Sequence, residues 1–339
     1  MEKYDVEERL PQYHQACRLG TDWLLTFTNE DGSIGPVEDS LYYYQVPWTY
    51  AIMGEFAAAS RLLDWIYHHM FTPEGAFEGV SPQGQFETRV GSYPLACLII
   101  GATLLRRFDI VYRGTRRLFA WQDPESGGFY QRLDGSDEQE ILTTAQGGMT
   151  FIMVGQIEAA RKAGEWMKRL WDLQPDVEHR LHPIYSPSEG LVTDYAPDRE
   201  IFCVVKKDDP WQRHFSAGMA AAFLTKLYMA TGEKDWLDLA RKYEAFSMTT
   251  DECQFQSMQV CKSSWGGGLL YVATRERQYR DWTVRMGDWY LESQFEDGHW
   301  EDTKHWVPHP TAASNIEITS EFVRYIADII MYLSVREER

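Results

Sequence analysis

Two kinds of apolar segment alternate along the chain, and both have helical spacing. Segments of the first kind, such as 233–246, are apolar on one side and charged on the other. This pattern predicts amphipathic helices at the surface of the fold. Segments of the second kind are apolar nearly all round and rich in small residues, which predicts helices buried on every side. Six segments are of this second kind: 48–54, 93–105, 143–154, 214–229, 263–273 and 316–333.

A turn containing glycine follows the amphipathic segments, about nine residues after their tryptophan or phenylalanine. The four clear copies of this turn span 31–35, 74–77, 126–129 and 297–300. Glycine adopts the left-handed conformation at little cost, so we expect each glycine to end a helix and the next apolar residue to fold back onto that helix. Two further copies, behind Trp166 and Trp236, are degenerate.

The same unit of outer helix, glycine turn, loop and inner helix recurs along the whole chain. Six buried helices with six amphipathic partners predict an all-α fold, an (α/α)6 toroid of six inner and six outer helices. We expect a single domain over residues 1–339, with a long loop insertion around 174–213. An open α-solenoid is the alternative, but the unequal repeat lengths and the lack of obvious capping repeats disfavour it.

The glycine turns behind tryptophan-bearing helices resemble the repeats of the terpenoid cyclase and protein prenyltransferase superfamily. Members of this superfamily form an (α/α) toroid, and the resemblance covers most of the chain, so it implies this fold. The same architecture hosts sugar epimerases, glycosidases, polysaccharide lyases, lanthionine cyclases and a linalool dehydratase-isomerase. The resemblance therefore leaves the activity open.

The metal and acid motifs of that superfamily are not intact in this chain. Zinc prenyltransferases carry Asp-x-Cys, whereas here Gln259 precedes Cys261, and residues 315–317 hold no histidine where the distant ligand would fall. A lone thiolate does not hold zinc tightly. No DxDD is present, and residues 208–209 lack the third carboxylate of DDxxD. We therefore expect no metal and no cofactor. A second group of possible zinc ligands consists of Asp251, Cys253, His305 and His309. This group is disfavoured as a metal site because its Asp-x-Cys pair lies at the end of a predicted outer helix.

Composition and charge narrow the range of partners. The 339 residues include 33 Lys and Arg against 51 Asp and Glu, a formal net charge of −18, and 14% are aromatic. This acidic balance disfavours nucleic acid and anionic lipid as partners. The longest apolar run, 94–105, is too short to cross a membrane. We expect a small-molecule substrate, no nucleic acid and no membrane span, while the oligomeric state is not predicted.

The cysteines and the start of the chain predict a cytoplasmic location. The five cysteines are odd in number, sparsely placed and without a CxxC pair, which favours reduced thiols over a disulfide framework. Residues 1–9 are charged and lack the apolar core of a secretory signal.

Candidate site residues follow from the longest polar insertions, which fall at the N-terminal ends of the predicted inner helices. Free N–H groups and helix dipoles favour anionic character there, so we expect a site at these entries. Carboxylates, an imidazole and a phenol supply proton transfer, and the predicted catalytic residues are Asp39, Asp194, His214 and Tyr44. The predicted substrate-binding residues are Trp48, Glu87, Arg89, Tyr93, Tyr195, Trp211, Trp265 and Glu317. Structural roles, such as capping for His214, are the alternative for each.

Three functions are compatible with these residues. The first is a cofactor-independent cyclase, isomerase or lyase for a largely apolar molecule such as a terpenoid or polyene. In it Asp39 or Asp194 protonates or deprotonates the substrate, His214 is the proton partner of that aspartate, and Tyr44 orients the substrate. The second is a carbohydrate epimerase, glycoside hydrolase or lyase, and the third is a non-catalytic binding module. A cavity lined by carboxylates and arginine would favour a sugar, and one lined by Phe, Tyr and Met would favour an apolar substrate.

Overall fold

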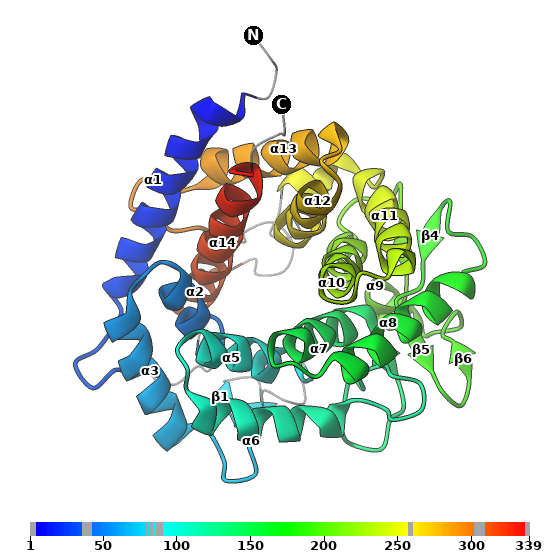
Figure 1. Cartoon of the computed structure of the whole chain (residues 1–339), viewed down its shortest axis with the longest axis horizontal. Helices are drawn as coiled ribbons and strands as arrows, with labels where there is room; N and C mark the ends of the chain where they lie inside the picture. Colours follow the sequence, from blue (N-terminus) through cyan, green and yellow to red (C-terminus); the bar gives the residue numbers. More distant parts are fainter. Residues whose placement is uncertain are drawn as a thin grey trace. The chain divides into compact units, whose positions relative to one another are not determined.

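The computed structural model shows a chain that is mostly helical, with a few short strands (Figure 1). The chain divides into two compact units, each described by itself. The first unit comprises Met1–Val90, Pro94–Phe119 and Val284–Arg339, and the second comprises Gly91–Tyr93 and Ala120–Thr283. The structure describes residues 5–35, 43–78, 80–81, 84–85, 91–256, 260–301 and 309–335.

Helices make up most of the described part of the first unit. They are α1 (Val6–Leu25), α2 (Val46–Ile52), α3 (Phe56–His69), α5 (Tyr93–Leu104), α6 (Phe108–Leu118), the 3-10 helix η1 (Phe119–Trp121), α13 (Arg277–Ser293), which contributes to both units, and α14 (Ala312–Leu333). Strands β1 (Val80–Ser81) and β2 (Gly84–Gln85) form an antiparallel pair. α14 begins with a capping box between Thr311 and Ser314, which satisfies backbone groups at its first turn. α14 packs against both α1 and α2.

α10 is largely buried among the other helices of the second unit. The helices of this unit are α7 (Ile141–Met153), α8 (Ile157–Asp172), η2 (Pro197–Arg199), α9 (Glu200–Cys203), α10 (Phe215–Thr231), α11 (Lys234–Met248), η3 (Glu252–Gln256) and α12 (Val260–Thr274). α10 packs against α7, α8, α11 and α12. A Cβ on Gly218 of α10 would lie 2.6 Å from the Cα of Ser263 in α12, so glycine at this position lets the two helices approach closely.

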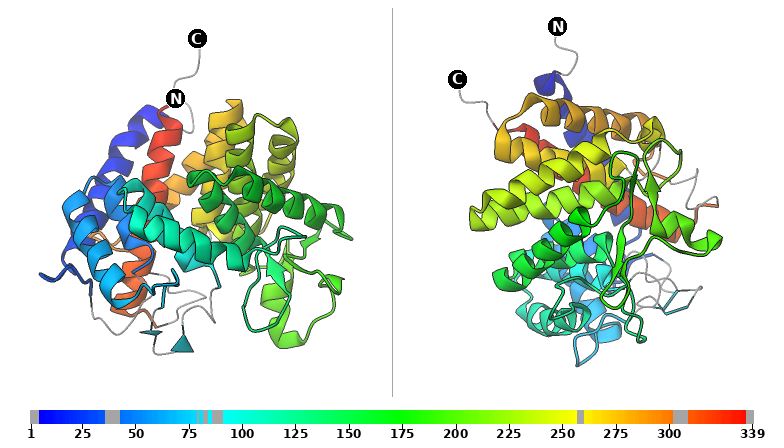
Figure 2. Two further views of the ribbon diagram at one scale, coloured as in Figure 1. Left: turned by 60° about the horizontal axis from the view of Figure 1, so that its bottom comes forward. Right: turned by 90° about the vertical axis from the view of Figure 1, so that its right-hand side faces the viewer.

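The segment predicted as a long loop around 174–213 contains short strands. They are β4 (Arg180–Leu181), β5 (Ile184–Ser186), β6 (Gly190–Leu191) and β7 (Val205–Lys206), in the green part of the chain between α8 and α10 (Figure 2). β3 (Gln139–Glu140), β5 and β6 form one antiparallel sheet, and β4 pairs with β7. Strands of two or three residues have too little alternation to be recognised in a sequence. The expectation of one domain stays a prediction.

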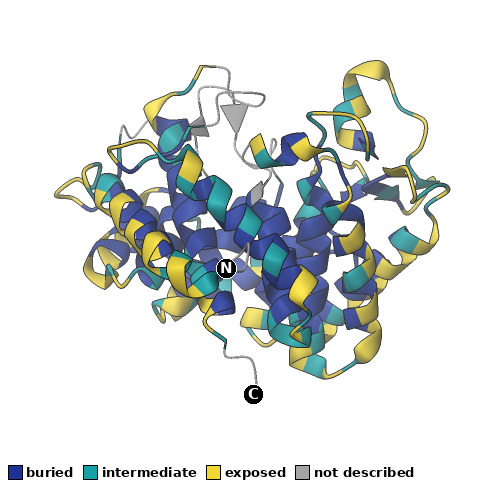
Figure 3. Ribbon diagram, turned by 90° about the horizontal axis from the view of Figure 1, so that it is seen from above, coloured by how far each residue is buried: buried dark blue, intermediate teal, exposed yellow. Residues whose placement is uncertain are grey.

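All six segments predicted as buried helices form helices, namely α2, α5, α7, α10, α12 and α14. In α10 the consecutive residues Ala220, Ala221 and Ala222 are all 0% exposed, so no side of the middle of this helix faces solvent. In α11, by contrast, Trp236 and Tyr243 are buried while charged residues between them are exposed. Figure 3 shows the same alternation of buried and exposed positions on the surface helices. The all-round apolar pattern therefore identified the inner helices correctly.

The glycine turns have the left-handed backbone that the sequence predicts, but they do not end helices. Gly75 has a φ of 90°, yet α3 ends earlier, at His69, and the bridge between Phe71 and Phe77 closes the loop around the glycine. A Cβ on Gly75 would lie 2.2 Å from the carbonyl oxygen of Arg113 in α6. The turn thus packs on the backbone of another amphipathic helix instead of capping its own, which is why only glycine fits.

The same contact recurs in both units. Gly127 has a φ of 84°, and its Cβ would lie 2.2 Å from the carbonyl oxygen of Lys162 in α8. Gly32 and Gly298 make corresponding contacts with the backbones of Arg61 and Leu19. The apolar residues after the four glycines are almost completely buried: Ile34, Phe77, Phe129 and Trp300. The turns therefore tie neighbouring outer helices together, and the apolar residue after each glycine is buried.

None of the helices in the described part of the chain has the length and apolarity needed to cross a lipid bilayer. All five cysteines are buried, and none of them forms a disulfide.

Candidate functional site

Three predicted site residues lie outside the described residues: Asp39, Glu87 and Arg89. Their roles stay predictions.

Three others, Tyr44, Trp48 and Glu317, come together in the first unit. Tyr44 stands in the turn before α2, is 4% exposed, and donates a hydrogen bond from its hydroxyl to Oε1 of Glu317 on α14. α2 is held against α14 nearby, because Thr49 Oγ1 donates to the carbonyl oxygen of Ser320 at 2.7 Å. We call the group formed by Tyr44, Trp48, Glu317, Glu321, Arg324 and Tyr325 the Tyr44 cluster.

A buried guanidinium completes the Tyr44 cluster. Arg324 is 0% exposed, and its Cζ lies 4.1 Å from the ring centroid of Trp48 and 4.0 Å from that of Tyr325. Its Nη2 lies 3.7 Å from Oε1 of Glu321. These contacts combine cation–π attraction with a buried ion pair. The helical spacing of residues 317, 321 and 324 brings two carboxylates and this cation to one side of α14.

The phenol of Tyr44 keeps its proton in this environment. Burial raises the pKa of Tyr44 well above its usual value, and the neighbouring carboxylates of Glu317 and Glu321 raise the same pKa further. A phenol that stays neutral remains a hydrogen-bond donor. Tyr44 therefore orients the carboxylate of Glu317, which is half-buried.

A second group of polar residues, which the sequence analysis missed, gathers where α7, α10 and α12 begin. Nη1 of Arg213 donates to Oε2 of Glu140 at 3.3 Å, and Nε2 of Gln131 donates to the same oxygen at 3.0 Å. The half-buried ring of Phe215 has Cζ of Arg213 at 5.2 Å from its centroid and Nζ of Lys262 at 5.3 Å. We call Gln131, Glu140, Arg213, Phe215 and Lys262 the Arg213 cluster. Its signal in the sequence is a charged residue at the start of each of three buried helices.

His214 lies just before α10, but its ring is enclosed by the preceding loop. It is 0% exposed, and burial lowers the pKa of His214, while the backbone at Lys206 and the carboxylate of Asp251 act in the opposite direction. Trp211 has a φ of 59°, unusual for a bulky residue, and its backbone N–H donates to Sγ of Cys253 at 3.0 Å. These contacts hold the loop against η3. They give a structural account of both residues, and their catalytic and binding roles stay predictions.

The remaining predicted residues lie apart from these groups in the described structure. Asp194 is exposed and forms no hydrogen bond or ion pair with any described residue. Tyr195 is half-buried, with its ring centroid 6.4 Å from that of His182. Tyr93 begins α5 and is 6% exposed. Trp265 is 2% exposed within α12, and Nζ of Lys226 lies 5.9 Å from its ring centroid. Of the candidates described, only Tyr44, Trp48 and Glu317 form a common cluster.

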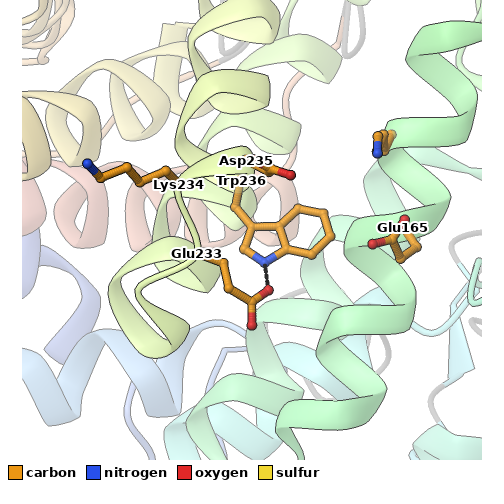
Figure 4. Close-up of a pocket in the computed structure, with 6 residues that line it drawn as sticks. Glu165, Glu233, Lys234, Asp235 and Trp236 are labelled. Carbon is orange, nitrogen blue, oxygen red and sulfur yellow. Dashed lines mark hydrogen bonds between the residues drawn. The ribbon is translucent and has the colours of Figure 1, made fainter.

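A pocket of about 290 Å³ lies between α8 and α11 of the second unit (Figure 4). Its lining residues belong to these two outer helices and the turn before α11: Glu165, Lys168, Glu233, Lys234, Asp235 and Trp236. Glu233 accepts a hydrogen bond from Nε1 of Trp236 at 2.7 Å and pairs with Arg161 at 2.7 Å. None of the predicted site residues lines this pocket, and its carboxylate at Glu233 is already paired. Across the ranges that the structure describes, no group of His, Cys, Asp and Glu is arranged to hold a metal ion.

The structure is similar over nearly its whole length to solved enzyme structures, whereas the sequence matches no protein-family profile and no curated protein. A D-mannose isomerase superposes with a TM-score of 0.68 at 10% identity, over 93% of this chain and 96% of that chain. A sugar epimerase from a ruminal bacterium gives 0.63 at 11% identity, over 93% and 98%. A type II terpene cyclase from Scytonema gives 0.61 at 10% identity, over 96% and 99%.

These similarities establish the fold. The matched enzymes have (α/α)6 toroid folds, so the predicted all-α toroid and its resemblance to the terpenoid cyclase superfamily are confirmed. The sequence identity to these structures is only 10–11%, so the similarity shows a common fold and does not show a common reaction. These three matched proteins are an isomerase, an epimerase and a cyclase, and a family 76 glycoside hydrolase also superposes, with a TM-score of 0.63 at 12% identity over 95% of this chain and 78% of that chain.

Proposed function

We propose that this protein is an enzyme that isomerises or epimerises a carbohydrate-like small molecule by acid–base proton transfer at the Tyr44 cluster. The observation that carries this proposal is the hydrogen bond from Tyr44 to Glu317, within a group whose other polar members are a carboxylate and a guanidinium. The similarity in fold to a D-mannose isomerase and a sugar epimerase supports the same reaction class.

Glu317 is the proposed base. Isomerisation of a hydroxy-carbonyl compound removes a proton from the carbon next to the carbonyl group and returns a proton to the same or the adjacent carbon. In isomerisation one carboxylate can carry this proton between the two carbons, while the hydroxyl proton of the substrate moves to the carbonyl oxygen through the enediol. In epimerisation the proton returns to the opposite face of the same carbon. Tyr44 is the proposed positioning residue, because its protonated hydroxyl holds one carboxylate oxygen of Glu317 in a fixed direction.

The contacts of Arg324 favour a hydroxylated substrate over the apolar one that led the sequence analysis. Cyclisation of a terpenoid needs open aromatic faces to stabilise a carbocation. One face of Trp48 and one face of Tyr325 are instead covered by the guanidinium of Arg324. Carboxylate, phenol and guanidinium groups match the hydroxyl groups of a sugar, as donors and acceptors, better than an isoprenoid chain.

Product formation tests the proposal. The purified protein is incubated with a panel of aldoses and ketoses, and separately with a glycoside and a polyprenyl diphosphate, and the products are separated by chromatography. We expect conversion of at least one sugar into an isomer. E317Q should lower its rate at least about 100-fold by removing the base, and Y44F about 10-fold by removing a hydrogen bond to a charged group.

Matched variants separate these effects from general damage. Tyr112 on α6 is 72% exposed, so Y112F removes a phenol hydroxyl without touching the cluster and should leave the rate unchanged. Full activity in E317Q would exclude Glu317 as the base. Conversion of only the polyprenyl probe, or hydrolysis of the glycoside without isomerisation, would overturn the proposed substrate class or reaction.

A further inference from the structure

The Arg213 cluster holds more positive than negative charge in a buried setting. Arg213 is 7% exposed and Lys262 is 6% exposed, whereas Glu140, at 8%, is the carboxylate that contacts Arg213. The nearby carboxylate of Glu138 is paired with Arg199 at 2.7 Å. Burying a cation is costly unless an anion or a set of acceptors compensates it.

Arg213 has donors to spare. A guanidinium carries five N–H donors in a planar fork. Among the described residues the only hydrogen-bond acceptor of Arg213 is Oε2 of Glu140, which is reached by Nη1 at 3.3 Å. The Nε and Nη2 groups of this side chain, which is more than nine-tenths buried, therefore have no described acceptor. A carboxylate or phosphate is the group whose geometry fits such a fork.

Three helix starts meet at the same place. Glu140 precedes the first residue of α7, Arg213 lies two residues before α10, and Lys262 lies in the first turn of α12. The contacts of Arg213 with Glu140, and of Lys262 with Phe215, bring these starts side by side. Each start carries the positive end of a helix dipole. The helices add to the positive potential of the two side chains.

The ring of Phe215 gives the cluster an accessible floor. Both cations lie about equally far from its centroid, at 5.2 and 5.3 Å, and the ring is only half-buried. A small molecule that reaches the ring would find both cations beside it.

We infer that the Arg213 cluster is a binding site for the anionic group of a small molecule, a carboxylate or a phosphate. Arg213 and Lys262 bind the anionic oxygens, and Glu140 and Gln131 hold the guanidinium in place. The inference is independent of the chemistry proposed for the Tyr44 cluster, because it concerns other residues and is measured as binding without turnover.

Isothermal titration calorimetry of the purified protein tests this site. The probes are inorganic phosphate and acetate as free ions, glucose 6-phosphate and glucuronate as sugar-borne anions, and glucose as the neutral control. We expect at least one anion to bind, glucose to bind more weakly than its charged counterparts, and affinity to fall as the salt concentration rises. Tighter binding of the sugar-borne anions would identify a substrate group, and equal binding of the free ions would identify an ion site.

Three variants locate the binding. R213Q and K262Q should each weaken it about 10-fold or more, because each removes a charged hydrogen-bond donor. E140Q removes the competing negative charge and should keep or strengthen binding. The matched controls are R161Q and K168Q, which each remove one positive charge from α8. Arg161 is half-exposed and Lys168 is exposed, and both variants should bind the anion as the wild type does.

Two results would overturn the inference. One is that no probe binds the wild-type protein at concentrations up to about 10 mM, which would mean a dissociation constant above that of an ordinary anion-binding site. The other is that folded R213Q and K262Q, with the circular dichroism of the wild type, bind the same anion with unchanged affinity. If R213Q does not fold, the other two variants decide. Unchanged anion binding by K262Q together with weaker anion binding by E140Q would also overturn the inferred site.

Discussion

Replacing Glu244 by glutamine should make folding stability less dependent on pH. Glu244 lies on the amphipathic helix α11 but is 0% exposed, and a Cβ on Gly266 of α12 would lie 2.1 Å from its Oε2. The missing side chain of Gly266 thus makes room for the carboxyl group. Burial raises the pKa of Glu244 well above its usual value, and this outweighs the opposing contacts with the N–H of Gly267 and with Trp282.

The sign and size of the effect follow from proton linkage. In the unfolded chain the carboxyl group ionises near pH 4.5, whereas in the folded protein it stays protonated to a higher pH. Its contribution to folding is therefore intact below pH 4.5 and is lost as the pH rises toward the raised folded pKa. The loss is about 1.4 kcal/mol per pH unit wherever the unfolded group is ionised and the folded group is still protonated.

Urea denaturation of the wild type and E244Q between pH 4.5 and 8 measures this effect. Glutamine cannot ionise, so the variant should gain stability relative to the wild type as the pH rises above 4.5, by about 1.4 kcal/mol per pH unit while the folded carboxyl group stays protonated. E165Q, at an exposed position on α8, is the control and should follow the wild type. A difference between E244Q and the wild type that is the same at every pH would refute the reasoning.

Two further predictions concern the packing of the fold. G75A should lower the free energy of unfolding by more than about 2 kcal/mol, because a Cβ at φ 90° would lie 2.2 Å from the carbonyl oxygen of Arg113. The control G135A, at φ 96° with no atom within 4 Å, should lower it by only about 1 kcal/mol. Equal shifts in the melting temperatures of the two variants would contradict this prediction. All five cysteines are buried, and burial raises the pKa of Cys253 to about 11. A thiol reagent at pH 8 should therefore label on average fewer than about one cysteine per molecule of native protein, and all five in urea. Rapid labelling of several cysteines in the native protein would contradict this prediction.

The helices were predictable because their signal is local. The all-round apolar pattern of α10 and the one-sided pattern of α11 each lie within a single stretch of sequence, and so do the glycine turns. The partner of each turn was not predictable, because Gly75 contacts Arg113 through the fold and not through sequence spacing. The short strands between α8 and α10 were missed because two or three residues are too few to show the alternation of a strand.

The candidate site was predictable only in part. Tyr44 and Glu317 were identified because both stand near the entry to a buried helix, where polar groups are unusual, and the fold brings them together. Arg324 was missed because a charge in an apolar helix has no local sign of the aromatic rings that will cover it. Glu244 looked like part of a solvated face, although the glycines of α12 indicated a close approach whose partner the sequence could not name.

Exchange of substrate hydrogen with solvent deuterium tests the central claim most directly. The sugar that the wild-type protein converts is incubated in D2O with the wild type, E317Q or Y44F, and its carbon-bound protons are followed by proton NMR. Proton transfer at the Tyr44 cluster predicts deuterium at the carbon beside the carbonyl group, about 100-fold more slowly with E317Q and about 10-fold more slowly with Y44F. Conversion of the sugar without any deuterium entering that carbon, or exchange at the wild-type rate in E317Q, would contradict it.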